Sequence, residues 1–139
     1  DPPTGLMLVH DGDRVWGDLT NGRGNPVGKY SMFAQSIDPF AKDTPWRKDL
    51  PVRPRAMLKS GDLLFLGVMP MDIIPNDPHS AYDGWQGGSL WVCSEKDGSQ
   101  LAAYALPAPV NWDGMAAAGR RLYLSMADGR LICMAPVDP

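Results

Sequence analysis

The sequence predicts an all-β fold made of antiparallel four-stranded blades of a β-propeller, incomplete at about two and a half blades. Two observations predict it. Short strand-like segments separated by turn residues recur along the 139-residue chain, and helical periodicity is weak. One strand–turn–strand pattern also occurs three times, and this repetition favours a propeller over a single sandwich or barrel.

The predicted strands are short runs of apolar residues, several of them β-branched or aromatic, with turn residues on both sides. Met115–Ala118 is rich in alanine, but Gly114 and Gly119 bracket it too closely for a helix. We expect strands at Leu6–Val9, Arg14–Trp16, Tyr30–Ser36, Arg55–Leu58, Leu63–Val68, Ser89–Cys93, Gln100–Ala105, Met115–Ala118, Arg121–Ser125 and Arg130–Met134.

The connections between many of these strands contain a glycine that can adopt positive φ without a Cβ clash. Such a residue allows a tight hairpin between neighbouring strands. We expect hairpin turns at His10–Asp13, Lys59–Asp62, Asp97–Gly98 and Asp128–Gly129.

The repeat defines three units, which we place at residues 6–54, 55–112 and 113–136. Gly12 aligns with Gly61, 49 residues later, and Gly61 aligns with Gly119, 58 residues later. The second offset also places Trp46 on Tyr104.

The last unit is the shortest, because it passes directly from Ala127 through Asp128–Gly129 into its next strand. At the same point the first unit holds Gly17–Lys29 and the middle unit holds Met69–Gln86. We therefore expect two long loops at equivalent positions on one rim, where a rigid scaffold commonly presents its functional residues.

Composition excludes several classes of protein. The net charge is −3, and the 13 basic residues are mixed with 16 acidic ones, so the basic patch of a nucleic-acid binder is missing. No apolar run approaches the roughly 20 residues of a membrane-spanning helix. The chain opens at Asp1, and no targeting signal is visible.

Two segments resemble the PQQ-like, quinoprotein-type propeller repeat: Gly88–Val92 followed by Lys96–Leu101. A more specific resemblance is to the C-terminal blades of large PQQ-like propeller proteins from planctomycete-type bacteria, and it lies in Arg55–Met57, Trp112–Gly119, Leu122–Ser125 and Asp128–Cys133. The repeat usually carries a tryptophan four residues after the turn glycine, docked between blades, where this chain has Ala102. We expect Tyr104 and Trp46 to take that role.

The resemblance implies that the propeller is incomplete, because such propellers close with about 4 to 8 blades. The partners it implies are other protein chains or the remainder of the same propeller. It also implies a periplasmic or exported location. Under an alternative interpretation, the chain is one arc of a quinoprotein dehydrogenase that binds PQQ and Ca²⁺ in a site completed by further blades.

The candidate ligands for such a calcium ion lie in the second insertion: the side-chain oxygens of Asp72, Asn76, Asp77 and Asp83, together with His79. Their spacing does not match a calcium loop with alternate ligands and a central glycine. We expect them, like Asp11 and Asp13 around Gly12, to form turns and not to bind a metal. No cofactor is therefore predicted outside the quinoprotein alternative.

No catalytic constellation is predicted either. His10 and His79 lack metal-ligand spacing, and Gly22–Gly28 lacks the Lys-Ser/Thr ending of a phosphate-binding loop. We expect Cys93 and Cys133 to be buried, unpaired thiols on strands.

The aromatic residues of the second insertion are the best candidates for a binding surface. We expect Trp16, Trp46, Trp91 and Trp112 to pack between blades, whereas Trp85 lies among glycines at the end of a loop. Tyr82 and Trp85 could stack on a ligand or partner there, with His79 and Asp83 beside them. The function predicted from the sequence is a non-catalytic interaction or scaffold module.

Overall fold

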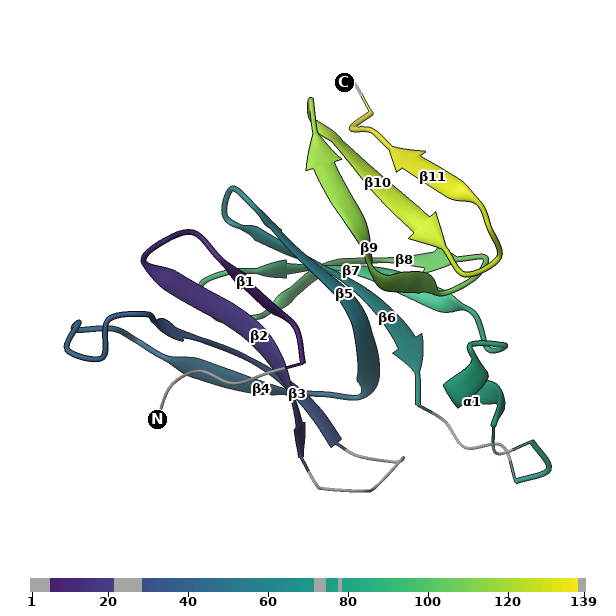
Figure 1. Cartoon of the computed structure of the whole chain (residues 1–139), viewed down its shortest axis with the longest axis horizontal. Coiled ribbons are helices and arrows are strands. Elements are labelled where there is room, and N and C mark those ends of the chain that lie inside the picture. Colours follow the sequence, from purple (N-terminus) through teal and green to yellow (C-terminus); the bar gives the residue numbers. More distant parts are fainter. Residues whose placement is uncertain (1–5, 22–28, 72–74, 78, 138–139) are drawn as a thin grey trace.

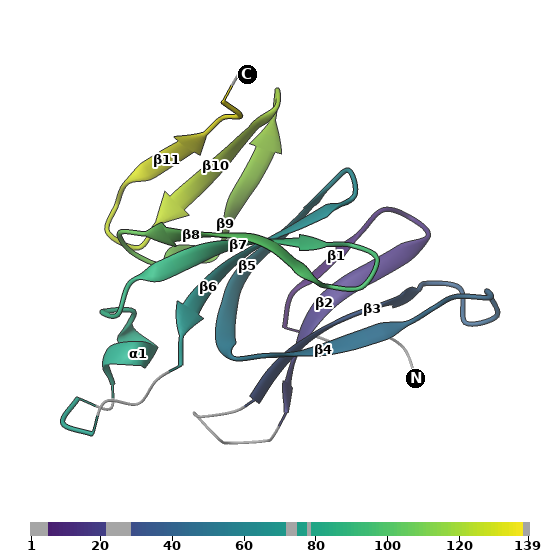
Figure 2. The same cartoon turned by 180° about the vertical axis from the view of Figure 1, so that it is seen from behind.

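The computed structural model describes residues 6–21, 29–71, 75–77 and 79–137. The fold is all-β, as predicted: three antiparallel sheets follow one another in chain order, like successive blades of an arc that does not close into a ring (Figures 1 and 2). Each predicted strand overlaps a strand of the structure. Across these described ranges, no helix has both the length and the hydrophobicity of a membrane span.

The first sheet has the order β1-β2-β3-β4, with β1 at Leu8–His10, β2 at Arg14–Asn21, β3 at Lys29–Ser36 and β4 at Trp46–Leu50. The predicted insertion Gly17–Lys29 was wrong at both ends, because Gly17–Asn21 and Lys29 extend the β2–β3 hairpin. Only residues 22–28 between them lie outside the description. Gly17 has low strand propensity, but a Cβ there would lie 2.6 Å from Leu8 and 2.8 Å from Phe33, so close packing requires glycine.

Strand β4 was missing from the prediction. Its sequence, Trp-Arg-Lys-Asp-Leu, is charged in the middle and shows no clear alternation of apolar residues. It can form a strand because it lies at the sheet edge, where the side chains of Arg47, Lys48 and Asp49 stay exposed to solvent. Trp46 and Leu50, at its two ends, face the core.

The second sheet has the order β5-β6-β7-β8, with β5 at Val52–Ser60, β6 at Leu63–Pro70, β7 at Gly88–Ser94 and β8 at Gln100–Leu106. A short helix, α1 (Ser80–Asp83), lies in the connection between β6 and β7. The third sheet has the order β11-β10-β9, with β9 at Val110–Ala118, β10 at Arg121–Met126 and β11 at Leu131–Met134. The predicted unit boundaries, after residues 54 and 112, therefore fall inside β5 and β9.

Strand pairing corrects one alignment within the repeat. Trp16 pairs with Ala34, and Phe65 pairs with Val92. Because Trp16 and Phe65 are 49 residues apart, like the aligned Gly12 and Gly61, these two pairs are equivalent. In the next strand, Ala34 pairs with Trp46, whereas Val92 pairs with Ala102. Trp46 is thus equivalent to Ala102 and not to Tyr104. The sequence offset was wrong by two residues because it ignored how each fourth strand pairs with the third.

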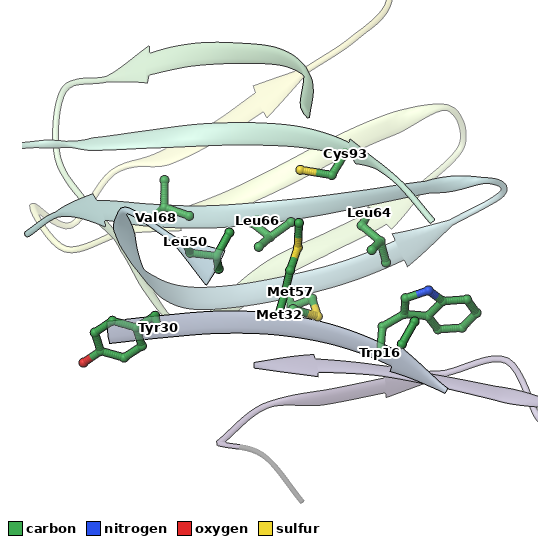
Figure 3. Close-up of a cluster of buried hydrophobic side chains, with 10 residues drawn as sticks. Trp16, Tyr30, Met32, Leu50, Met57, Leu64, Leu66, Val68 and Cys93 are labelled. Atoms are coloured by element: carbon green, nitrogen blue, oxygen red, sulfur yellow. The ribbon is translucent and has the colours of Figure 1, made fainter. Parts of the chain in front are cut away.

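The interface between the first two sheets is an apolar core. Trp16, Met32 and Leu50 from the first sheet face Met57, Leu64 and Leu66 from the second, and Figure 3 shows these side chains between the sheets. Leu64 and Leu66 have no exposed surface. Burying side chains of this size stabilises the fold by about 1.5–3 kcal/mol each.

A second core lies between the second and third sheets. It includes Leu90 from β7, Val110 from β9 and Leu124 from β10. Gly67 permits the close approach of β6 and β9, because a Cβ there would lie 2.9 Å from Val110. The second sheet is therefore packed on both faces.

Candidate functional site

The segment between β6 and β7 contains the residues predicted to bind, and α1 is anchored within it. Ser80, which is buried, donates through Oγ to the carbonyl oxygen of Asp77 at 2.9 Å. Gln86 Nε2 donates to Ser80 Oγ at 2.9 Å, and the Trp85 N–H donates to the carbonyl oxygen of Ser80 at 2.9 Å. A buried hydroxyl at the start of α1 thus connects both sides of the turn.

Gly84 fixes this turn against the body of the protein. Its φ of 82° is left-handed and ends α1, a conformation that favours glycine. A Cβ at Gly84 would lie 2.7 Å from Cγ of Pro109, in the connection between β8 and β9. The turn therefore contacts the scaffold directly.

Three of the four predicted binding residues have described side chains, and all three are exposed on this turn. Trp85 is 75% exposed, and His79 and Asp83 lie at the two ends of α1. The Asp83 N–H donates to the carbonyl oxygen of His79 at 2.8 Å. Tyr82 has its backbone in α1, while its side chain lies outside the described part of the structure. We name His79–Gln86, excluding the undescribed side chains, the α1 rim.

The predicted turn role of Asp11 agrees with its contacts. Its Oδ1 accepts hydrogen bonds from the N–H groups of Asp13 at 3.1 Å and Arg14 at 3.0 Å. The bond from Arg14 is the main reason that the pKa of Asp11 is lowered. In the second insertion, Asp77 uses its carbonyl oxygen to accept from Ser80, and Asp72 lies outside the described residues. Among the residues described, no three His, Cys, Asp or Glu side chains group together as metal ligands would.

Two of the tryptophans predicted to pack between blades donate hydrogen bonds to the same carbonyl oxygen between the first two sheets. Trp16 and Trp46 each donate an indole N–H to the carbonyl oxygen of Glu95, both at 3.1 Å. Lys59 Nζ lies 4.8 Å from the centre of the Trp16 ring and pairs with the Glu95 carboxylate at 3.0 Å. The sequence predicted that these indoles pack between blades, but not that they share a partner, because Glu95 is 49 and 79 residues away from them.

Trp112 was predicted to pack between blades, and it does contact the second sheet from the third, although it stays 47% exposed. The guanidinium carbons of Arg53 and Arg55 lie 5.2 and 5.5 Å from the centre of its ring. The indole therefore packs against two cations of β5 from its place near the start of β9. Burial, followed by the charge of Arg53, lowers the pKa of Arg55.

The prediction for the two cysteines holds for one of them. Cys93 is buried, and burial raises the pKa of its thiol, whereas Cys133 is exposed. Cys133 is exposed because β11 lies at the edge of its sheet, where one face and one side of the strand remain uncovered.

The sequence analysis also missed a buried carboxylate. Asp18 has no exposed surface, and its Oδ1 accepts from the Met7 N–H at 2.7 Å, whereas Oδ2 has no hydrogen-bond partner among the described residues. Burial is the main cause that raises the pKa of Asp18. The sequence did not indicate this burial, because an aspartate in a strand is ordinarily exposed, even two residues after an apolar residue such as Trp16.

No protein-family model, curated protein or solved structure matches this chain.

Proposed function

We propose that this chain is a non-catalytic interaction or scaffold module, part of a larger propeller or multi-chain assembly, that binds a partner protein through the α1 rim. The observation that carries the proposal is Trp85, which is 75% exposed on an anchored turn. The resemblance of the sequence to PQQ-like propeller proteins supports the same role and a periplasmic or exported location.

An exposed tryptophan suits a protein partner for two reasons. The indole offers a large apolar surface together with one N–H donor, and tryptophan is enriched among the residues that contribute most to protein interfaces. Trp85 also lies just after α1, and its own N–H donates to the carbonyl oxygen of Ser80, which holds its backbone in place. A partner would therefore order little of the chain on binding, which reduces the entropic cost of association.

Site-specific photo-crosslinking in the cells that make the protein tests this proposal. Trp85 is replaced by a benzophenone amino acid, and Phe40, which is 92% exposed on the β3–β4 connection, is replaced in the same way as the control. We expect a discrete protein adduct from position 85 that position 40 does not give. We also expect Trp85→Ala to stop co-purification of that protein.

Stability measurements separate loss of contact from loss of fold. Because Trp85 is mostly exposed, Trp85→Ala should change the free energy of unfolding by no more than about 0.5 kcal/mol. Equal crosslinking at positions 85 and 40, or unchanged co-purification of the partner with Trp85→Ala, would show that the α1 rim is not the binding surface.

A further inference from the structure

The first strand of the second sheet, β5, is interrupted by a bulge at Arg55. Pro54 and Ala56 pair with consecutive residues of β6, whereas Arg55 between them has no partner on that strand. In an unbroken strand, Arg55 and Met57 would lie on the same face of the sheet. Instead, Met57 packs in the first core, and Arg55 reaches a residue of the third sheet. The bulge therefore turns the Arg55 side chain away from the first core and toward β9.

A second bulge, in β9, contains the residue that Arg55 reaches, Trp112. The strand pairs on either side of it leave residues 111–114 opposite a single residue of β10. Asp113, next to Trp112, has φ of 53°, which is uncommon for a residue other than glycine. β5 and β9 lie side by side (Figures 1 and 2), so the two irregular segments meet. Bulges are frequent next to functional sites, which directs attention to this junction.

Two positive charges share one indole ring at this junction. The guanidinium carbons of Arg53 and Arg55 lie 5.2 and 5.5 Å from the centre of the Trp112 ring. Burial, followed by the like charge of Arg53, lowers the pKa of Arg55. No carboxylate of the described residues forms an ion pair with Arg55. A bound anion would therefore relieve a repulsion that the described residues leave in place.

The hydrogen bonds of Arg55 leave one side of its guanidinium group open. Nη1 donates to Sδ of Met69 at 3.3 Å, and a thioether is a weak acceptor. Nε and Nη2, on the other side, have no hydrogen-bond partner among the described residues. Two neighbouring N–H donors of this kind bind a carboxylate or phosphate through two parallel hydrogen bonds. Nε is covered, so an anion reaches Nη2 first and both donors once the side chain turns outward.

We propose that Arg53, Arg55 and Trp112 form a binding site for a small oxyanion of the carboxylate or phosphate class. Arg55 donates to two oxygens of the anion, Arg53 adds positive potential, and the indole of Trp112 forms one wall. Trp112 is 47% exposed, so the site can be reached from solvent. Two donors beside one aromatic ring suit a single anionic group. The site includes no residue of the α1 rim and adds a second binding activity that does not depend on the proposed function.

Nuclear magnetic resonance of the full chain tests the site with two probes, inorganic phosphate and acetate. Each is titrated in place of chloride at constant pH and ionic strength, which holds general charge screening fixed. We expect the indole N–H signal of Trp112 to shift until it saturates, whereas that of Trp85, which is 75% exposed on the α1 rim, should not shift. Saturation by either anion supports the site, and the anion that binds more tightly identifies the class.

Substitutions at Arg55 separate the guanidinium group from its charge. Arg55→Gln should weaken binding of the preferred anion by about 10-fold or more, because a charged pair of hydrogen bonds is lost. Arg55→Lys keeps the charge without the two-donor edge, so its affinity should fall between those of Arg55→Gln and the wild type.

Arg121→Gln is the matched control. Arg121 is exposed and pairs with Ala118, at the opposite end of β9 from Trp112. Its replacement removes the same charge and should leave the affinity for the anion unchanged. An equal loss of affinity in Arg121→Gln and Arg55→Gln would show that net charge alone attracts the anion, which would overturn the site.

Chemical modification of the wild type tests the site without relying on a variant that folds. Phenylglyoxal reacts with arginine side chains, and mass spectrometry locates the product. We expect saturating phosphate or acetate, whichever binds, to slow modification of Arg55 and to leave that of Arg121 unchanged. Equal protection of both residues would contradict a local site.

Two other results would overturn the inference. A Trp112 signal that saturates with neither anion would show that the arginines only pack on the ring. In the native assembly isolated from cells, an Arg55 that phenylglyoxal fails to modify even without added anion would be covered by protein, from this chain or another. Either result would reject the oxyanion site, whereas crosslinking at Trp85 would still test the proposed function separately.

Discussion

Gly98→Ala should weaken the interface between the first two sheets more than an ordinary glycine substitution does. Gly98 has φ of 68°, so an alanine there costs about 1 kcal/mol in backbone strain alone. Its Cβ would also lie 2.7 Å from Cζ3 of Trp46 and 2.8 Å from Cε of Met32. Overpacking of this kind costs about 1–3 kcal/mol, which gives a total of about 2–4 kcal/mol.

The surroundings decide whether this overlap can relax. Met32 is 1% exposed and lies in the first core, so its methyl group has little free space. The indole of Trp46 donates to the carbonyl oxygen of Glu95, and moving the ring would break that bond. We therefore expect most of the overpacking cost to remain.

Urea unfolding of four variants measures the effect: Gly98→Ala, Gly61→Ala, Trp46→Ala, and Trp46→Ala combined with Gly98→Ala. Gly61→Ala is the matched control, because Gly61 has φ of 59° and a Cβ there would meet nothing within 4 Å. It should lose about 1 kcal/mol. Trp46→Ala combined with Gly98→Ala should lose less than the sum of the single variants, since the ring that causes the overlap is gone. A loss for Gly98→Ala no greater than that for Gly61→Ala would refute the close packing of this turn.

Three further predictions concern burial. Asp18→Asn should stabilise the protein at neutral pH, and this gain in the free energy of unfolding should shrink toward about pH 3. Burial raises the folded pKa of Asp18, so the wild type no longer bears the cost of a buried charge once the carboxyl takes up a proton. Chemical unfolding at both pH values checks this, and a gain independent of pH would contradict it. Leu66→Ala, at a site with no exposed surface, should lower the free energy of unfolding in urea by about 2–5 kcal/mol. Leu131→Ala, at a site that is 72% exposed, should lower it by about 0.5 kcal/mol or less, and equal losses would contradict the core assignment. Iodoacetamide should label Cys133 in the folded protein and Cys93 only after unfolding, as followed by mass spectrometry, and equal labelling rates would be inconsistent with their burial.

The strands that could be predicted are those whose own residues alternate or cluster as apolar groups. Leu63–Val68 reads as a strand because it is apolar throughout, and β6 extends it by only two residues. β4 could not be predicted, because Arg47, Lys48 and Asp49 pair at a sheet edge that exists only after β3 is in place. Gly17–Asn21 was missed because Gly17, Asp18 and Asn21 have low strand propensity, and pairing with β3 makes this segment a strand.

The candidate binding site was predicted in part. The glycines around Trp85 indicated a turn that could present an aromatic side chain, and His79, Asp83 and Trp85 are exposed on that turn. The anchoring of α1 through Ser80 and Gly84 could not be predicted, since it depends on Gln86 and on Pro109 from another connection. The exposure of Trp112 was also unexpected, because its cationic neighbours come from β5.

The sequence by itself determined the all-β class, the positions of most hairpins and the threefold repeat. Each of these depends on residues close together in the chain: apolar spacing sets a strand, and a glycine with positive φ sets a turn. Only the tertiary structure decided that Trp46 is equivalent to Ala102, that Asp18 is buried and that Arg53 and Arg55 contact the ring of Trp112. These features depend on strand register and on contacts between sheets, where each residue's neighbours are distant in sequence.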